Sequence, residues 1–190
     1  MCIRNHLLLV ALVVCLPWNL LHAQTDVNEK ELAEKHVSES VAELFRMMHD
    51  GEFGKHYSVI SPPKLDWTDI PSLLAKAESS ESLASFPIHT LSSQSQSDCS
   101  EGVVALWLIE SIRSQGEYPS LNPMFHCLDK NDPLKGKEMH QAALEAYQNW
   151  WSSISESVDL DDDEAVSKAI ESTNPLKDKN ICWYGAVNRC

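Results

Sequence analysis

The chain has 190 residues, of which 15 are basic and 28 are acidic, so its formal net charge is −13. An acidic surface repels nucleic acid and anionic lipid headgroups, which excludes both as expected partners. The same charge favours solubility and suits a basic partner protein. No cofactor is expected, because the six glycines are scattered and form no phosphate-binding loop.

The first 23 residues predict a secretory signal peptide. Arg4 precedes an apolar run from Leu7 to Leu16, and a short segment ending in Ala23 leads into polar sequence. A basic start, a short apolar core and a small residue at the cleavage point are typical of exported proteins, and the run is too short to cross a membrane. We therefore expect cleavage after Ala23 and export to the periplasm or out of the cell.

Cleavage leaves residues 24–190 as one expected helical domain without a transmembrane segment. This part keeps 14 basic and 28 acidic residues, a net charge of −14, and it is long enough to bury a core unaided. A lipid anchor on Cys15 is a minor alternative. It is disfavoured because Val14 is bulkier than the residue usually found before a lipidated cysteine.

The cysteines of the mature chain are Cys99, Cys127, Cys182 and Cys190. An even number in an exported protein predicts up to two disulfides, with three connectivities. We prefer Cys99–Cys127 with Cys182–Cys190, since the second pair closes a short loop, and the other two connectivities stay open. Cys99 also precedes a helix start, where a nucleophilic thiolate is an alternative, but an oxidising compartment favours the disulfide.

Hydrophobic periodicity predicts helices along most of the chain. The first covers Glu29–His49, and a short helix follows Asp69, which is a suitable cap. A serine-rich passage from Ser79 to Ser100 indicates a loop. The apolar run Val103–Arg113 then predicts a central helix that is covered on several sides.

Two more helices are expected at Lys135–Ile154 and Asp159–Glu171, and the acidic first turn of the second one suits the helix dipole. The tail Ile181–Tyr184 is expected to be a short strand or a docked coil. The predicted fold is therefore all-α, a compact bundle of four to five helices with long loops and at most a short strand near the carboxyl end.

The central helix and the loop after it carry the candidate binding residues. Trp107, Glu110 and Arg113 lie at i, i+3 and i+6, so the two charged groups can pair. One interpretation is a binding pocket in which Glu110 is the carboxylate and Arg113 clamps an anion. The other, which we favour, is a structural ion pair that holds the following loop. The full set of candidates is Trp107, Glu110, Arg113, Tyr118 and Asn122.

No catalytic residue and no metal site is predicted. Asp159, Asp161 and Asp163 have the spacing that opens a calcium loop, but Glu164 stands where that loop requires glycine. A helix amino terminus explains these acids better. Two other groupings lack zinc-site spacing: His126 with Cys127, and Glu138 with His140.

Four runs in the carboxyl-terminal half stand out: Ala105–Arg113, Tyr118–Pro123, Tyr147–Trp151 and Asn174–Leu176. On these runs the chain resembles small exported proteins of Gram-negative bacteria that belong to domain families of unknown function. The resemblance implies a compact helical domain. It brings no activity, so no catalytic residue is carried over.

Size, acidity, export and the lack of a catalytic motif favour a non-enzymatic function. The leading hypothesis is an exported domain that binds another protein, basic in character, as an inhibitor, an immunity protein or an adaptor. Its expected surface combines the Ser92–Ser100 loop, the Glu110 and Arg113 end of the central helix, and the Tyr118–Asn122 loop.

Two other classes stay open at this stage. One is a cell-envelope hydrolase, for which Glu110, His126 and Asp98 are the available acid or base groups. The other is a structural component of the envelope. An enzyme requires its acid and base groups to converge in one pocket.

Overall fold

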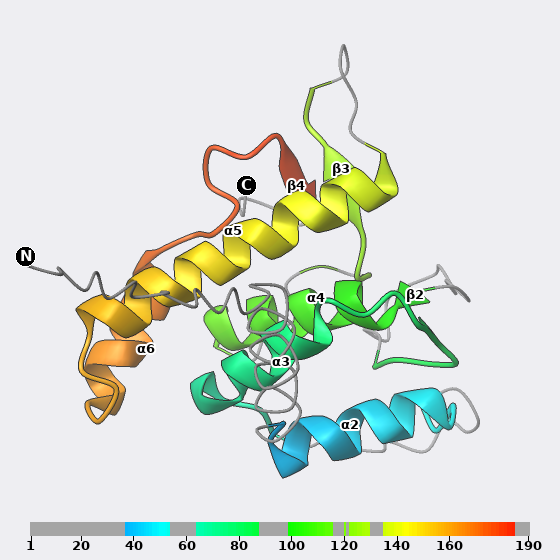
Figure 1. The fold of residues 1–190 in the computed structure, drawn as a ribbon, viewed down its shortest axis with the longest axis horizontal. Coiled ribbons are helices and arrows are strands. Elements are labelled where there is room, and N and C mark those ends of the chain that lie inside the picture. The colour runs from blue at the N-terminus through cyan, green and yellow to red at the C-terminus, as the bar shows by residue number, and fades with distance from the viewer. Residues whose placement is uncertain are drawn as a thin grey trace, which may run out of the picture. The chain divides into compact units, whose positions relative to one another are not determined.

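A computed structural model describes residues 37–53, 64–87, 99–115, 120, 122–129 and 135–184. These residues form five α-helices, one 3₁₀ helix and two antiparallel sheets of two strands each (Figure 1). The domain is mostly helical, and the prediction of an all-α fold is corrected by the two small sheets. The predicted signal segment lies outside the described residues.

The helices are α2 (Glu39–His49), the 3₁₀ helix η1 (Trp67–Asp69), α3 (Ile70–Lys76), α4 (Glu101–Arg113), α5 (Gly136–Ser157) and α6 (Asp163–Ser172). The strands are β1 (Ser82–Leu83), β2 (Cys99–Ser100), β3 (Phe125–Cys127) and β4 (Ile181–Trp183). The helices expected after Asp69, in the central apolar run and in the two later segments are therefore present, with ends that differ by a few residues.

The start of α2 is set by a side-chain cap. The Ser38 hydroxyl accepts a hydrogen bond from the Val41 amide, and the Ser38 backbone is extended. A helix that ran unbroken over Glu29–His49 would need helical backbone here, so that prediction is wrong at Val37 and Ser38. Their neighbours from residue 36 back lie outside the described residues.

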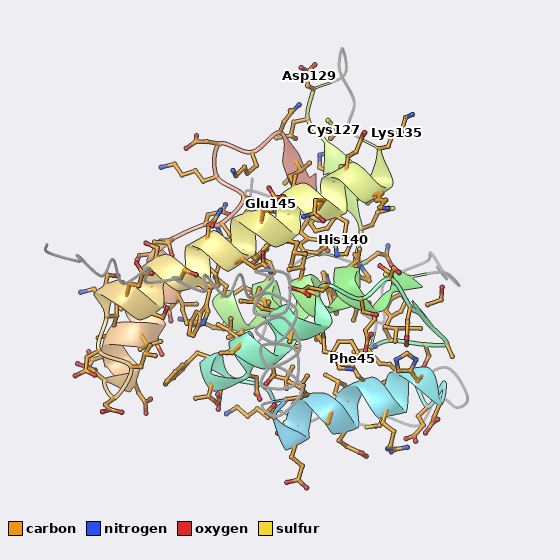
Figure 2. All side chains as sticks on the ribbon, viewed as in Figure 1. Phe45, Cys127, Asp129, Lys135, His140 and Glu145 are labelled. Atoms are coloured by element: carbon orange, nitrogen blue, oxygen red, sulfur yellow. The ribbon has the colours of Figure 1, made fainter. Side chains whose placement is uncertain are left out.

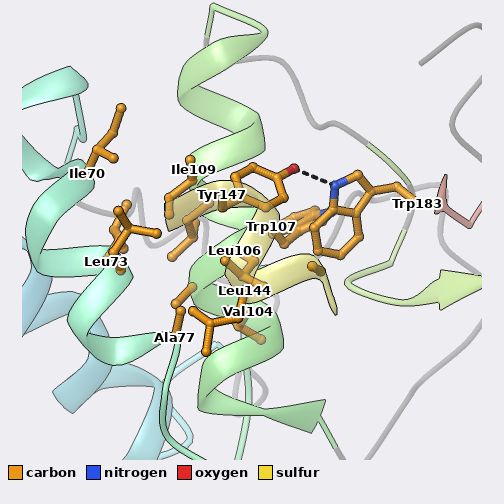
Figure 3. Packing of buried hydrophobic residues seen from close by; sticks show 14 of the residues in the cluster. Ile70, Leu73, Ala77, Val104, Leu106, Trp107, Ile109, Leu144, Tyr147 and Trp183 are labelled. Atoms are coloured by element: carbon orange, nitrogen blue, oxygen red, sulfur yellow. Dashed lines mark hydrogen bonds between the residues drawn. The ribbon is translucent and has the colours of Figure 1, made fainter. Parts of the chain in front are cut away.

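Helix α4 is the centre of the domain. Most of its residues are buried, on nearly every side of the helix. Both α3 and α5 pack against it, and α6 contacts α4 and α5. The close view in Figure 3 shows side chains of α3, α4 and α5 packed together, among them Ile70, Leu106 and Tyr147. The expectation of a central helix covered on several sides is confirmed.

The carboxyl-terminal strand completes one of the sheets. β4 pairs antiparallel with β3, with Phe125 opposite Trp183, and their rings stack with centroids 4.0 Å apart. All three β4 residues are buried. Of the two forms expected for this tail, the strand is the one found.

The other sheet lies inside the passage that was expected to be a loop. β1 pairs with β2, and two further backbone hydrogen bonds continue the attachment into α4. The Glu101 amide donates to the Glu81 carbonyl at 2.8 Å, and the Gly102 amide donates to the Ser79 carbonyl at 3.1 Å. The first turn of α4 is thereby fixed to the segment that follows α3.

Gly102 is needed because this attachment brings backbones into close approach. A Cβ atom at Gly102 would lie 2.5 Å from the Ala77 carbonyl oxygen and 2.6 Å from that of Ser79. His140 of α5 closes the same space, and its Nε2 donates to the Ala77 carbonyl at 3.0 Å (Figure 2). No larger residue fits without movement of the main chain.

We expect Gly102→Ala to lower the free energy of unfolding by about 1–3 kcal/mol, the usual cost of overpacking. Urea denaturation followed by circular dichroism would measure it. Gly136→Ala is the matched control, because Gly136 begins α5 and no atom lies within 4 Å of a Cβ built there. Equal destabilisation by the two substitutions would contradict the close-approach argument.

Candidate functional site

A buried carboxylate, Glu110 of α4, is the centre of a polar network. Glu110 is 1 % exposed. The Arg113 Nε lies 3.0 Å from each Glu110 carboxylate oxygen, and the Tyr147 hydroxyl donates to Oε2 at 2.7 Å. The Trp183 indole donates in turn to the Tyr147 oxygen at 2.9 Å, the dashed line in Figure 3. The network therefore joins α4, α5 and β4.

The same network reaches the segment after α6. A second Arg113 nitrogen donates to the Thr173 carbonyl at 3.2 Å. The Trp150 indole donates to the Thr173 hydroxyl at 2.7 Å. Arg113 is thus satisfied by groups of the protein itself, and the structural ion pair is the interpretation that this geometry favours.

The electrostatics of the network fix the protonation states of Tyr147 and Arg113. Burial raises the pKa of Tyr147 well above its usual value, and the charge of Glu110 adds to the rise. Burial lowers the pKa of Arg113, but its hydrogen bonds and charge interaction with Glu110 outweigh that effect, so the pKa is raised. Tyr147 is therefore a neutral donor and Arg113 a permanent cation, and this suits a structural role better than proton transfer.

Two other candidate binding residues, Trp107 and Asn122, are connected to each other through Ser120. The Trp107 indole donates to the Ser120 hydroxyl at 2.9 Å, and that hydroxyl donates to the Asn122 carbonyl at 2.6 Å. All three residues are buried. The remaining candidate, Tyr118, lies outside the described residues.

Trp107 also lines a cavity of about 500 Å³ whose walls come from α2, η1, α4 and α6. Its apolar lining includes Leu44, Trp67, Trp107, Leu108, Ile112 and Ile170. Exposed charged residues stand at its edge: Lys64, Asp66 and Glu171. An apolar hollow with a few charged groups around it is the usual form of a ligand-binding site.

The sequence pointed to Trp107 alone among these lining residues. Leu108 and Ile112 share its helix, but Leu44 and Ile170 come from segments more than 100 residues apart, and no spacing in the sequence relates them. Only the fold, in which residues of α2, α4 and α6 line one cavity, brings them together.

Cys99 and Cys127 are not joined in the structure. The Cys99 thiol donates to the Pro123 carbonyl at 3.5 Å, and the Cys127 thiol donates to the Asp129 carbonyl at 3.4 Å (Figure 2). β2 and β3, which carry them, belong to different sheets. The preferred Cys99–Cys127 pairing therefore differs from the structure. Cys182 is buried and Cys190 lies outside the described residues, so their pairing stays a prediction.

A second cavity, of about 870 Å³, is lined by both Cys99 and His140. A cysteine beside a histidine is a nucleophile when its thiol ionises. Burial raises the pKa of Cys99 to about 12, against a smaller lowering by the Ser100 backbone. Burial also lowers the pKa of His140, whose Nε2 is engaged by the Ala77 carbonyl. The Cys99 thiol is therefore protonated, and the nucleophile alternative is disfavoured.

The hydrolase hypothesis needs Glu110 and His126 in one pocket. His126 is the middle residue of β3, opposite Cys182, whereas its neighbour Phe125 stacks on Trp183. Successive side chains of a strand point to opposite faces, and Trp183 contacts the Glu110 network through Tyr147. His126 and Glu110 are thus on opposite faces of this sheet. Asp98 lies outside the described residues.

Among the described residues, one group of side chains has the composition of a metal site: His49, Glu81 and Glu101. Burial raises the pKa of Glu101, but the favourable interactions of its carboxylate with Ser79 and with the charge of Lys76 outweigh that effect and lower the pKa. The carboxylate is therefore ionised at neutral pH. Sequence spacing gives no hint of this group, because its members are 20 and 32 residues apart.

The acidic run before α6 is explained by helix capping. The Asp162 carboxylate accepts a hydrogen bond from the Ala165 amide, and Asp163 and Glu164 occupy the first turn. The positive end of the helix dipole stabilises negative charge at these positions. The expected helix with an acidic first turn is present, and it begins at Asp163, four residues later than expected.

Fold and site together define a small, mostly helical domain with a structural polar interior and an apolar cavity. The chain belongs to a family described as a domain of unknown function, DUF4943, which matches residues 31–184. No curated protein and no solved structure matches the chain. The family covers both halves of the chain, so the resemblance predicted for the carboxyl-terminal half was too narrow. In the part that the structure describes, no helix has the length and apolar character needed to cross a membrane.

We expect Tyr147→Phe to lower the free energy of unfolding by about 1–3 kcal/mol, because the Trp183 indole and a Glu110 oxygen both lose a buried partner. A double-mutant cycle with Glu110→Gln should give a coupling energy of about 0.5–3 kcal/mol. Tyr184→Phe is the control, since Tyr184 is 45 % exposed. Additive effects in the cycle, or a Tyr147 variant as mild as the control, would argue against the network.

Proposed function

We propose that the protein is an exported, non-enzymatic domain that binds a partner protein, in the manner of an inhibitor, an immunity protein or an adaptor. The observation that carries the proposal is the apolar cavity of about 500 Å³ between α2, η1, α4 and α6. The proposal places the function in this cavity and its charged edge.

The size and lining of the cavity suit an apolar side chain presented by a partner. Binding interfaces are often dominated by one or two large side chains that enter a pocket on the other protein. Burial of such a side chain contributes about 1.5–3 kcal/mol. Trp67 and Ile112 are only partly buried, so they keep surface that an incoming side chain could cover.

The charges around the cavity favour a partner with basic residues near its apolar anchor. Asp66 and Glu171 are exposed at the edge, with Lys64 as the opposing charge. The excess of acidic residues over the whole chain adds a long-range attraction for a basic protein. Such attraction acts mainly on the association rate and weakens with salt.

The enzymatic alternative is less well supported. A hydrolase that used Glu110 as acid or base would need that group to be accessible, and its oxygens are bonded to Arg113 and Tyr147. A structural role in the envelope is a further alternative. It differs from the proposal in that it assigns no ligand to the cavity.

To test the proposal, the tagged chain is produced in the organism from which it comes. The proteins that bind to it are then captured and identified by mass spectrometry. We expect one stoichiometric basic partner, whose affinity is then measured with purified proteins. Ser111→Phe should weaken that affinity at least tenfold, because Ser111 lines the cavity and the larger ring fills it.

Ser153→Phe is the matched control, since Ser153 is exposed on α5 and does not line the cavity. Circular dichroism checks that both variants are folded. An affinity that the two substitutions leave equal would refute binding through the cavity. Capture of no protein above background would favour a small-molecule ligand or the structural role.

A further inference from the structure

We propose that His49, Glu81 and Glu101 form a binding site for a divalent transition metal, for which zinc is the best match. Each residue offers one ligand atom, and these atoms lie within 4.8 Å of one another. The site is separate from the apolar cavity, and the inference does not depend on the proposed function.

The backbone holds the two carboxylates next to each other. Ser82 of β1 is paired with Ser100 of β2, so Glu81 and Glu101 are the next residues along the two strands. The hydrogen bond from the Glu101 amide to the Glu81 carbonyl, 2.8 Å long, extends this pairing. Two acidic side chains in neighbouring positions repel each other, so a cation between or beside them is stabilising.

The third ligand comes from the end of α2. The His49 Nε2 lies 3.5 Å from Glu101 Oε1, and the imidazole is 37 % exposed. Because this ring and Glu81 reach solvent, they have room to close by the small distance that coordination needs. Ligand atoms bound at about 2.1 Å to one zinc ion are roughly 3.4 Å apart.

Glu101 supplies the observation that points to a missing ligand. It is 3 % exposed, and its Oε1 is buried without a hydrogen bond. A buried carboxylate oxygen without a hydrogen bond is costly unless a strong cationic partner is present. The Lys76 ammonium group, 3.0 Å away, already offsets part of this cost, and a metal ion bound to this oxygen would take over that role.

In the absence of a metal ion, Lys76 provides part of the positive charge that Glu101 needs. Its ammonium nitrogen lies 3.0 Å from Glu101 Oε1, close enough for an ion pair but outside hydrogen-bond angles. The side chain of Lys76 is 32 % exposed, and its nitrogen lies 5.5 Å from the centre of the Phe45 ring. Metal binding would displace this ammonium group towards solvent, so Lys76 competes with the metal.

The donor set selects the metal. One imidazole nitrogen and two carboxylate oxygens are ligands that zinc accepts, and three protein ligands leave a fourth position for water. Calcium and magnesium prefer oxygen alone. Ligands from three separate elements would also connect α2, the turn before β1 and α4 when the ion is bound.

The test is a titration of the purified full-length chain with Zn²⁺ alone, by calorimetry and by competition with a chelating dye. We expect one zinc ion per chain with an affinity that His49→Gln and Glu81→Gln each weaken at least tenfold. Lys76→Met keeps most of the aliphatic stem and removes the competing charge, so it should tighten zinc binding several-fold.

Glu145→Gln is the control, because Glu145 is exposed on α5 and lies outside the group (Figure 2). The substituted side chains His49 and Glu81 reach solvent, so their variants should fold, which circular dichroism checks. No stoichiometric zinc binding would overturn the proposal. Binding that the His49 and Glu81 variants leave unchanged would also overturn it, because the ion would then be held elsewhere.

Discussion

The buried carboxylate of Glu110 is the constraint on which the packing around α4 depends. A buried carboxyl group inside a helix that is apolar on most sides has to be matched by donors, and α4 itself supplies only Arg113. The other donor, Tyr147, comes from α5, and Tyr147 is matched by Trp183 of β4. The angle and register at which α5 and β4 meet α4 are therefore limited by hydrogen-bond geometry as well as by apolar packing.

The long helices could be predicted from the sequence because their apolar residues recur at a helical period over three or more turns. The strands could not, since two or three residues show no period, and their pairing depends on partners far along the chain. The position at which α2 begins was missed for a different reason. Ser38 caps the start of α2 by a side-chain hydrogen bond, although the apolar pattern of the sequence continues across this residue.

The candidate site shows the same division. The contact between Glu110 and Arg113 follows from their spacing on one helix, and the sequence therefore predicts it. From the sequence, Tyr147 could be assigned only to the buried face of a helix and Trp183 only to a carboxyl-terminal tail. Nothing in either segment indicates that the residue has a carboxylate partner. The cavity and the His49 group are built entirely from distant segments, so they could be found only once the fold was known.

The position of β4 also determines when the core can form. Ile181, Cys182 and Trp183 are all buried, and Trp183 provides both a ring for Phe125 and a donor for Tyr147. A nascent chain that ends before residue 181 has helices with the right apolar faces but leaves Tyr147 and Phe125 uncovered. Cooperative closure of this core must therefore wait until synthesis has passed residue 183, and until then the earlier segments remain open to chaperones and proteases.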